Sequence, residues 1–209
     1  MASVGGPRDT NDGTTCMFGN SEIFMNTDDD LIFVSQDQRQ YNFTPLCTNL
    51  KKRICQNLQL PYISTANCEN VGVSENELRT PRTEQQIKSD GNCFFRAISY
   101  SLTNSEDFHS IIRNAVCDHL RQNKDLFQQF LRHGVQSIDM HLLSTRMSEN
   151  GTWATEVEIF AVAHLLKVDI YTYSAGQWLK FSVDNVEPII NKESGAIYLN
   201  HCMENHYNI

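Results

Sequence analysis

The stretch DGNCFFRAI, residues 90–98, places Cys93 where a tight turn passes into an apolar helix. Gly91 lets the backbone turn at little steric cost, and a side-chain oxygen of Asp90 or Asn92 can cap the first helical turn. Unpaired N–H groups and peptide dipoles at a helix N-terminus stabilise a thiolate relative to a thiol. The stretch therefore predicts a helix that begins at Cys93 and a nucleophilic thiol, although a lone cysteine on an apolar helix is more often inert core filling.

A candidate base for this thiol lies at the other end of the sequence, in NHYNI, residues 205–209. If this segment is a strand, His206 and Asn208 project from the same face, because side chains alternate along a strand. The amide oxygen of Asn208 can then accept a hydrogen bond from one imidazole nitrogen and leave the other to exchange a proton with Cys93. Taken alone, a terminal histidine is more often a solvated side chain; together with Cys93 it predicts a Cys-His-Asn hydrolase.

These two motifs resemble those of the ovarian tumour (OTU) family of papain-like cysteine proteases, most of which are deubiquitinases. Between them, Gly151-Thr152-Trp153, then Glu158-Ile159 and the apolar run at 168–173 are similar to the family's middle block. The resemblance covers about residues 83–209, and three motifs in the family's order are far more specific than any one of them. Ala154 departs from the glycine that many members have, at a position that carries no chemistry.

The resemblance implies an acyl transfer on ubiquitin conjugates without a cofactor or metal. Cys93 would attack the carbonyl of a glycine-terminated isopeptide, and His206 would protonate the leaving lysine amine and later activate water. The backbone N–H groups of Asp90, Gly91, Asn92 and Cys93 would form the oxyanion hole. In the family either the aspartate at position 90 or the residue at position 208 completes the site; we expect Asn208 to orient His206 and Asp90 to shape the loop, and the sequence leaves this assignment open.

Two other functions remain compatible with the motifs. One is a ubiquitin-binding module that keeps the fold without turnover, and the presence of both Cys93 and His206 argues against it. The other is a papain-like peptidase that acts on a different ubiquitin-like modifier through the same site. No motif reports the linkage preference, the pathway or the oligomeric state.

The composition indicates a soluble intracellular protein. The chain has 209 residues, 40% hydrophobic and 20% charged, with a net charge of −8 and no Lys/Arg-rich block of five, so we do not expect a nucleic acid partner. The sequence has no apolar run of signal-peptide or membrane-spanning length, so we expect no membrane partner. Seven cysteines without metal-ligand spacing fit reduced thiols and no zinc site, and favour a cytoplasmic location, with a nuclear one left open.

The sequence divides into three regions. Residues 1–40 are polar and acidic and are expected to be mostly disordered, apart from an apolar island at 31–34 that can dock or form a strand. Residues 41–82 are expected to form one short helix, ending before Pro61, and a linker. Residues 83–209 are expected to form the catalytic domain.

The catalytic region is expected to be α+β, with a small, mostly antiparallel sheet packed between helices. Beyond the helix at Cys93, the periodicity predicts three helices and four strands: helices over 108–120, 123–133 and 156–166, and strands over 168–173, 178–183, 196–200 and 206–209. We expect Trp153 to be a core anchor. Glu158 is either a buried hydrogen-bond partner or part of the helix surface.

Overall fold

The computed structural model describes residues 41–63, 77–188, 194–202 and 206–209, together with the backbone of three short strands between residues 16 and 34. The chain separates into two compact units, Met1–Arg39 and Gln40–Ile209. The first contains an antiparallel sheet in the order β1-β2-β3, formed by Cys16–Phe18, Ser21–Met25 and Leu31–Val34. The apolar island at 31–34 is thus strand β3, and most of the region predicted to be disordered lies outside the described residues.

The second unit contains all the described helices, among them the short helix expected near residue 50. Their bounds are α1 Thr48–Asn57, α2 Cys93–Thr103, α3 His109–Gln122, α4 Lys124–Phe127, the 3-10 helix η1 Gln128–Phe130, α5 Ile138–Thr145, α6 Glu156–Leu166 and the 3-10 helix η2 Val183–Asn185. The helix predicted over 123–133 is shorter than expected, because Leu131 is already extended after η1. The sequence patterns did not reveal α5, which begins where the Ser137 side chain accepts a hydrogen bond from the Met140 N–H.

A four-stranded mixed sheet forms the other half of this unit, in the order β5-β4-β6-β7. The strands are β4 Asp169–Ser174, β5 Gln177–Phe181, β6 Ala196–Cys202 and β7 His206–Asn208. Ala175 and Gly176, both with positive φ, make the tight turn from β4 to β5. Two of the three strand pairs are antiparallel, as expected, and the central β4–β6 pair is parallel. The antiparallel hairpin brings the end of β5 back beside the start of β4. Strand β6 starts at that same end of the sheet, so it runs parallel to β4.

Helices cover one face of the sheet, and extended segments cover the other in the described part of the chain. On the helical face, Phe181 of β5 packs on Phe160 of α6 with ring centroids 5.2 Å apart. On the opposite face, Tyr198 of β6 packs against Phe43, with ring centroids 4.6 Å apart. There the Trp178 indole N–H also donates a hydrogen bond to the Arg79 carbonyl (3.0 Å). The two faces therefore differ, since one meets helices and the other meets the segments at 41–46 and 77–85.

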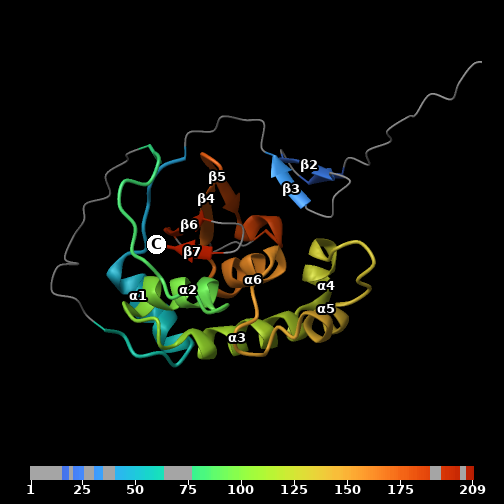
Figure 1. Cartoon of the computed structure of the whole chain (residues 1–209), viewed down its shortest axis with the longest axis horizontal. Helices are drawn as coiled ribbons and strands as arrows, with labels where there is room; N and C mark the ends of the chain where they lie inside the picture. Colours follow the sequence, from blue (N-terminus) through green and yellow to red (C-terminus); the bar gives the residue numbers. More distant parts are fainter. Residues whose placement is uncertain are drawn as a thin grey trace, which may run out of the picture. The chain divides into compact units, whose positions relative to one another are not determined.

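Helix α2 lies at the centre of the helical layer, with α3 running beneath α2 and α6 (Figure 1). Its apolar side chains Phe94, Phe95, Ile98 and Leu102 are almost fully buried. Phe94 meets Tyr207 of β7 edge to face, with ring centroids 5.3 Å apart. This contact places the N-terminal end of α2 beside the edge strand of the sheet.

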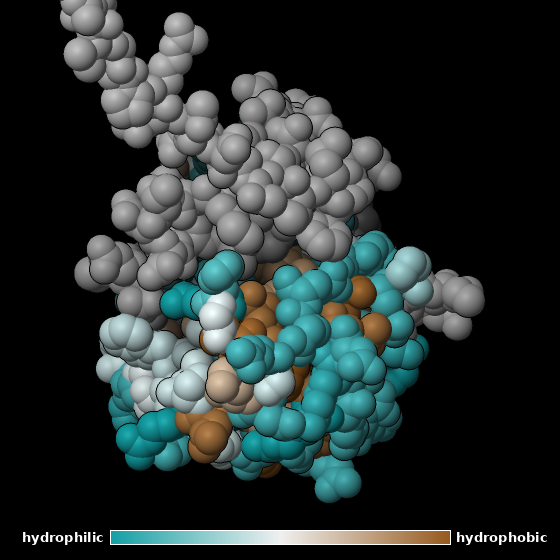
Figure 2. All heavy atoms as spheres, turned by 90° about the vertical axis from the view of Figure 1, so that its right-hand side faces the viewer, coloured by the Kyte–Doolittle hydropathy of each residue, from teal (hydrophilic) through white to brown (hydrophobic). Residues whose placement is uncertain are grey.

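The face of the molecule on the α4 and α5 side is mainly hydrophilic, with hydrophobic residues emerging between the polar ones (Figure 2). Within the described ranges, no helix is both long enough and apolar enough to span a membrane.

A pair of partly buried imidazoles joins α3 to α6. His119 Nε2 lies 2.8 Å from His164 Nδ1, and His164 Nε2 lies 3.0 Å from a carboxylate oxygen of Glu187. Burial, and then the neighbouring His164, lower the pKa of His119 from 6.5 to about 4. His119 therefore stays neutral in the folded protein at pH values where the unfolded chain is protonated.

We predict that acid weakens this helix packing. As the pH falls from about 6.5 to about 4, the unfolded chain gains a proton at His119 that the folded chain does not bind, and the free energy of unfolding falls by up to roughly 3 kcal/mol. Above pH 6.5 both states are neutral and this contribution is constant. Urea unfolding across this range should give a shallower pH slope for His119→Gln than for the wild type. The exposed His133→Gln is the control, and equal slopes for all three proteins would contradict the prediction.

Candidate functional site

The loop before α2, residues 89–92 and called here the nucleophile loop, is shaped by Asp90. The Asp90 carboxylate accepts hydrogen bonds from Arg96 Nη2 (2.6 Å) and Nε (3.0 Å), and from the Asn92 N–H (3.1 Å). The hydrogen bonds from Arg96 hold the pKa of Asp90 well below its ordinary value, so the carboxylate remains ionised. Asp90 thus fixes the turn that leads into Cys93, the role expected of it.

Cys93 is the first residue of α2 and is 4% exposed. Burial raises the pKa of its thiol, whereas the backbone N–H groups of Tyr207, Phe94 and Cys93 itself lower it. Donors at the helix N-terminus thus point at the sulfur, as the sequence predicts. Because burial outweighs them, the thiol needs a base close by to ionise near neutral pH.

Asn208 holds the imidazole of His206. Asn208 Oδ1 lies 3.0 Å from His206 Nε2, and the amide side chain is 2% exposed. The same oxygen accepts a hydrogen bond from the backbone N–H of Ile87 (2.9 Å). A backbone N–H can only donate, so it fixes which end of the Asn208 amide is the oxygen, and Nε2 must then be the protonated nitrogen.

The other imidazole nitrogen carries the lone pair that a base requires. His206 Nδ1 is buried, and in the described part of the chain it has no hydrogen-bond partner. One of the hydrogen bonds that the Cys93 sulfur accepts comes from the backbone N–H of Tyr207, the residue next to His206. The structure therefore joins His206 to Asn208 and places Cys93 against the backbone of Tyr207, the residue between them.

Residues 84–87 connect the nucleophile loop with the end of the chain, a role that sequence reasoning missed. Gln85 N–H donates to the Ile209 carbonyl, and Ile209 N–H donates back to the Gln85 carbonyl. Glu84 accepts a hydrogen bond from Asn208 Nδ2 (3.3 Å). No residue pattern could have revealed the contribution of Ile87, because it donates to Asn208 through its backbone N–H.

Asn92 connects the nucleophile loop to a second loop, residues 148–155. Its Oδ1 accepts hydrogen bonds from the Gly151 N–H (2.8 Å) and from Arg113 Nη2 (2.9 Å). Gly91 touches the same loop: a Cβ built on it would lie 2.0 Å from the Gly151 carbonyl oxygen. The predicted oxyanion-hole segment is thus fixed by a neighbouring loop as well as by its own turn. Sequence reasoning did not find Arg113, because a single basic residue within an amphipathic helix carries no signal.

Trp153 lies in the second loop, and the expectation that it anchors the core is wrong. Its side chain is 56% exposed. Helix α6 begins at Glu156, with Thr155 as its N-cap, so Trp153 precedes the buried positions of the helix. Glu158, in the first turn of α6, is buried. It completes the capping box with Thr155, and its Oε1 lies 2.8 Å from His141 Nε2.

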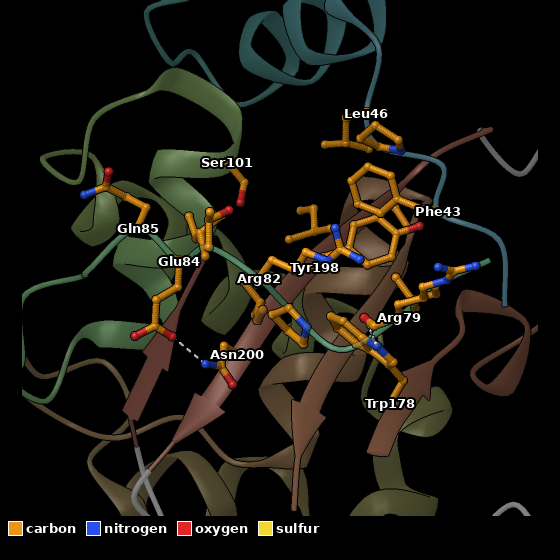
Figure 3. Close-up of a pocket in the computed structure, with 18 of the residues that line it drawn as sticks. Phe43, Leu46, Arg79, Arg82, Glu84, Gln85, Ser101, Trp178, Tyr198 and Asn200 are labelled. Carbon is orange, nitrogen blue, oxygen red and sulfur yellow. Dashed lines mark hydrogen bonds between the residues drawn. The ribbon is translucent and has the colours of Figure 1, made fainter. Parts of the chain in front are cut away.

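A pocket of about 680 Å³ is separate from this chemistry. It lies on the face of the sheet that the extended segments cover. There the side chains of Trp178 and Tyr198 from the strands lie near Arg82 of the segment at 77–85 (Figure 3). The described residues that line it do not include Cys93 or His206. Glu84 borders the pocket and reaches both Asn200 and Asn208, so the pocket adjoins the far side of the orienting amide.

We predict that Gly91→Ala disrupts the nucleophile loop. Gly91 has φ +79°, and the added methyl group would overlap the backbone of Gly151. Gly134 has φ +89° with open space around it, so Gly134→Ala is a matched control that incurs the backbone strain alone. Gly134→Ala should lower the free energy of unfolding by about 1 kcal/mol. Gly91→Ala should lower it further and change the rate at which iodoacetamide alkylates Cys93; equal effects of the two substitutions would refute the proposed loop contact.

Comparison with known proteins places the chain in a family. The family model described as OTU-like cysteine protease matches residues 88–207. The chain is 28% identical over 167 residues to OVARIAN TUMOR DOMAIN-containing deubiquitinating enzyme 10 of Arabidopsis thaliana, covering 75% of this chain and 45% of the relative. It is 26% identical over 126 residues to OTU domain-containing protein 5 of Homo sapiens, covering 59% of this chain and 21% of the relative.

The chain thus spans less than half the length of these curated relatives. Among solved structures, the OTU domain of OTUD1 superposes with a TM-score of 0.50 and 20% identity, covering 60% of this chain and 82% of that one. This likeness shows the α+β fold. Because the family model matches more than half of the sequence, the chain belongs to the family of OTU-like cysteine proteases.

Proposed function

We propose that this protein is a cysteine-dependent deubiquitinase, which hydrolyses isopeptide bonds at the C-terminus of ubiquitin through a thioester on Cys93. The observation that carries the proposal is the pair of hydrogen bonds that Asn208 Oδ1 accepts from Ile87 N–H and His206 Nε2. This pair leaves a buried imidazole lone pair at Nδ1, and Cys93 accepts a hydrogen bond from the residue next to His206. A relative described as a deubiquitinating enzyme supports the same substrate class.

The reaction begins with proton transfer from Cys93 to His206 Nδ1. The thiolate attacks the carbonyl carbon at the end of the ubiquitin chain, and the carbonyl oxygen becomes an oxyanion. His206 returns the proton to the lysine amine as the C–N bond breaks, which leaves a thioester on Cys93. Water then attacks this thioester with His206 as base, and ubiquitin leaves with a free carboxylate. Asn208 keeps its hydrogen bond to Nε2 when the ring is protonated, so it orients the imidazolium as well.

The oxyanion hole is assigned to the backbone N–H groups of residues 90–93. The Asn92 N–H already donates to Asp90, so it is a weaker candidate than its neighbours. Loss of one comparable donor in acyl transfer costs about 3 to 4 kcal/mol of transition-state stabilisation.

The acidic net charge of −8 complements the basic tail that ubiquitin presents to proteases of this family. We also propose a cytoplasmic location, because an odd number of cysteines, seven, fits reduced thiols better than a set of disulfides.

The first test uses ubiquitin that carries an electrophile at its C-terminus. We expect the full chain to form a covalent adduct through Cys93, and Cys93→Ala to form none, with peptide mapping to locate the bond. A matched probe built on another ubiquitin-like modifier should react far more slowly. Absence of a ubiquitin adduct with well-folded protein would reject the proposal, and a faster reaction with the other probe would reassign the substrate.

The second test asks which residue orients the imidazole. Asn208→Ala should lower kcat by about 10- to 100-fold at the pH optimum, because the ring loses the partner that selects its tautomer. Asp90→Ala should act differently, through the loop, and should lower the free energy of unfolding through loss of the Arg96 ion pair. Full activity of Asn208→Ala beside an inactive, folded Asp90→Ala would reverse the two assignments.

A further inference from the structure

Arg113 of α3 is a buried cation without a carboxylate beside it. Its side chain lies inside the protein, with the residue 2% exposed. Its guanidinium donates to the carbonyl oxygens of Met147 (2.9 Å) and Thr152 (2.7 Å) and to Asn92 Oδ1 (2.9 Å). Among the described residues no carboxylate lies within ion-pair distance of it. Burying an unpaired charge costs several kcal/mol, so its presence calls for an explanation.

The acceptors of Arg113 lie on the two loops that meet at the nucleophile. Asn92 is the N-cap of α2 and immediately precedes Cys93, and its carbonyl accepts the first helical hydrogen bond, from Arg96 N–H (2.9 Å). Thr152 lies in the second loop next to Gly151, which Gly91 contacts, and Met147 directly precedes that loop. The guanidinium carbon is also 4.2 Å from the ring centre of Phe95, in the first turn of α2. Arg113 thus fixes both loops and the start of the helix at once.

Because no described carboxylate forms an ion pair with Arg113, its positive charge acts on groups further away. The charged and titratable groups near Cys93 and Arg113 are Asp90 of the nucleophile loop, Arg96 of α2, His109 and Cys117 of α3, Glu156 and Glu158 of α6, and His206 and Tyr207 of β7. Asp90 is neutralised by Arg96 at 2.6 Å. Burial raises the pKa of Tyr207, so its hydroxyl is neutral. Burial lowers the pKa of Arg113, and negative charge at Cys117, Glu158, Asp90 and Cys93, in that order, raises it, so Cys93 is one of four groups that the charge of Arg113 reaches.

We propose that Arg113 is a positioning residue for the nucleophile, which locks the two loops around the oxyanion hole and supplies a positive charge, without an ion-pair partner among the described residues, that stabilises the Cys93 thiolate. The inference rests on the proposed thiol chemistry of Cys93. In a merely structural role, the hydrogen bonds would matter for folding and the charge would be incidental.

The test separates charge from position with three substitutions. Arg113→Met removes both, Arg113→Lys keeps the charge without the fork of donors, and Asn92→Ala keeps the charge and removes the acceptor on the nucleophile loop. Arg121→Met, an exposed change on the same helix, is the matched control. For each protein we would measure the pH dependence of Cys93 alkylation by iodoacetamide, kcat and KM on a ubiquitin substrate, and the thermal unfolding midpoint.

We expect Arg113→Met to raise the midpoint of the alkylation profile by about one pH unit, the shift of a tenfold change in the ionisation equilibrium. Arg113→Lys and Asn92→Ala should keep the wild-type midpoint, and both should lower kcat about tenfold or more with little change in KM. Arg121→Met should match the wild type in all three measurements. An unchanged alkylation midpoint in folded Arg113→Met, or wild-type kcat in Asn92→Ala, would overturn the proposal.

Replacing a buried charge by an apolar residue of similar length is often tolerated, so Arg113→Met is expected to fold. If it does not, Arg113→Gln removes the charge but keeps a donor for Asn92, and the same midpoint shift is required of it. The alkylation measurement needs no ubiquitin. A protein that fails to react with the ubiquitin probe but shows the midpoint shift would therefore refute the proposed substrate and leave the role of Arg113 standing.

Discussion

The hydrogen bond from the Ile87 backbone to Asn208 Oδ1 is the contact on which the chemistry of the site depends. That N–H holds the amide oxygen in place, and the Glu84 carboxylate, which accepts a hydrogen bond from Asn208 Nδ2, favours the same orientation. In this orientation, the amide oxygen faces Nε2 and the lone pair is at Nδ1. A neutral asparagine can orient a base in this way because its orientation is set by a second, fixed donor. This arrangement requires residues 84–87 to stay paired with residues 208–209, and the Gln85–Ile209 hydrogen bonds hold them there.

The nucleophile is fixed by a parallel arrangement on the other side of the site. Asp90 closes the turn with Arg96, and Asn92 accepts hydrogen bonds from Gly151 and Arg113. The contact between Gly91 and Gly151 leaves no room for a side chain at position 91. Each loop therefore limits the conformations of the other. Such rigidity suits an oxyanion hole, whose donors stabilise a transition state only if they are aligned before the charge develops.

Burial creates the difficulty that these contacts resolve. A thiol that is 4% exposed is protected from solvent, but burial also raises its pKa. The helix N-terminus offsets this effect in part. The remaining stabilisation must come from His206, once it holds the proton, and from the fixed positive charge that we assign to Arg113. The exposed Trp153 lies on the loop that Arg113 holds through the Thr152 carbonyl.

The sequence by itself determined the local elements that carry the chemistry. The turn before Cys93, the strand period that puts His206 and Asn208 on one face, and the bounds of α6 follow from patterns within a few residues, and such patterns act through backbone sterics and hydrogen bonds between near neighbours. The identity of the orienting residue was favoured but not decided, because both Asp90 and Asn208 have the required chemistry.

Only the tertiary structure decided which distant groups meet these elements. The backbone N–H of Ile87, the guanidinium of Arg113, the exposed position of Trp153 and the parallel pairing of β4 with β6 depend on segments that are far apart in sequence. A backbone donor has no sequence signature, and an arginine or a tryptophan has the same local pattern whether it is buried or exposed. Their roles are fixed by packing, because packing determines which polar groups lose water and must find partners inside the protein.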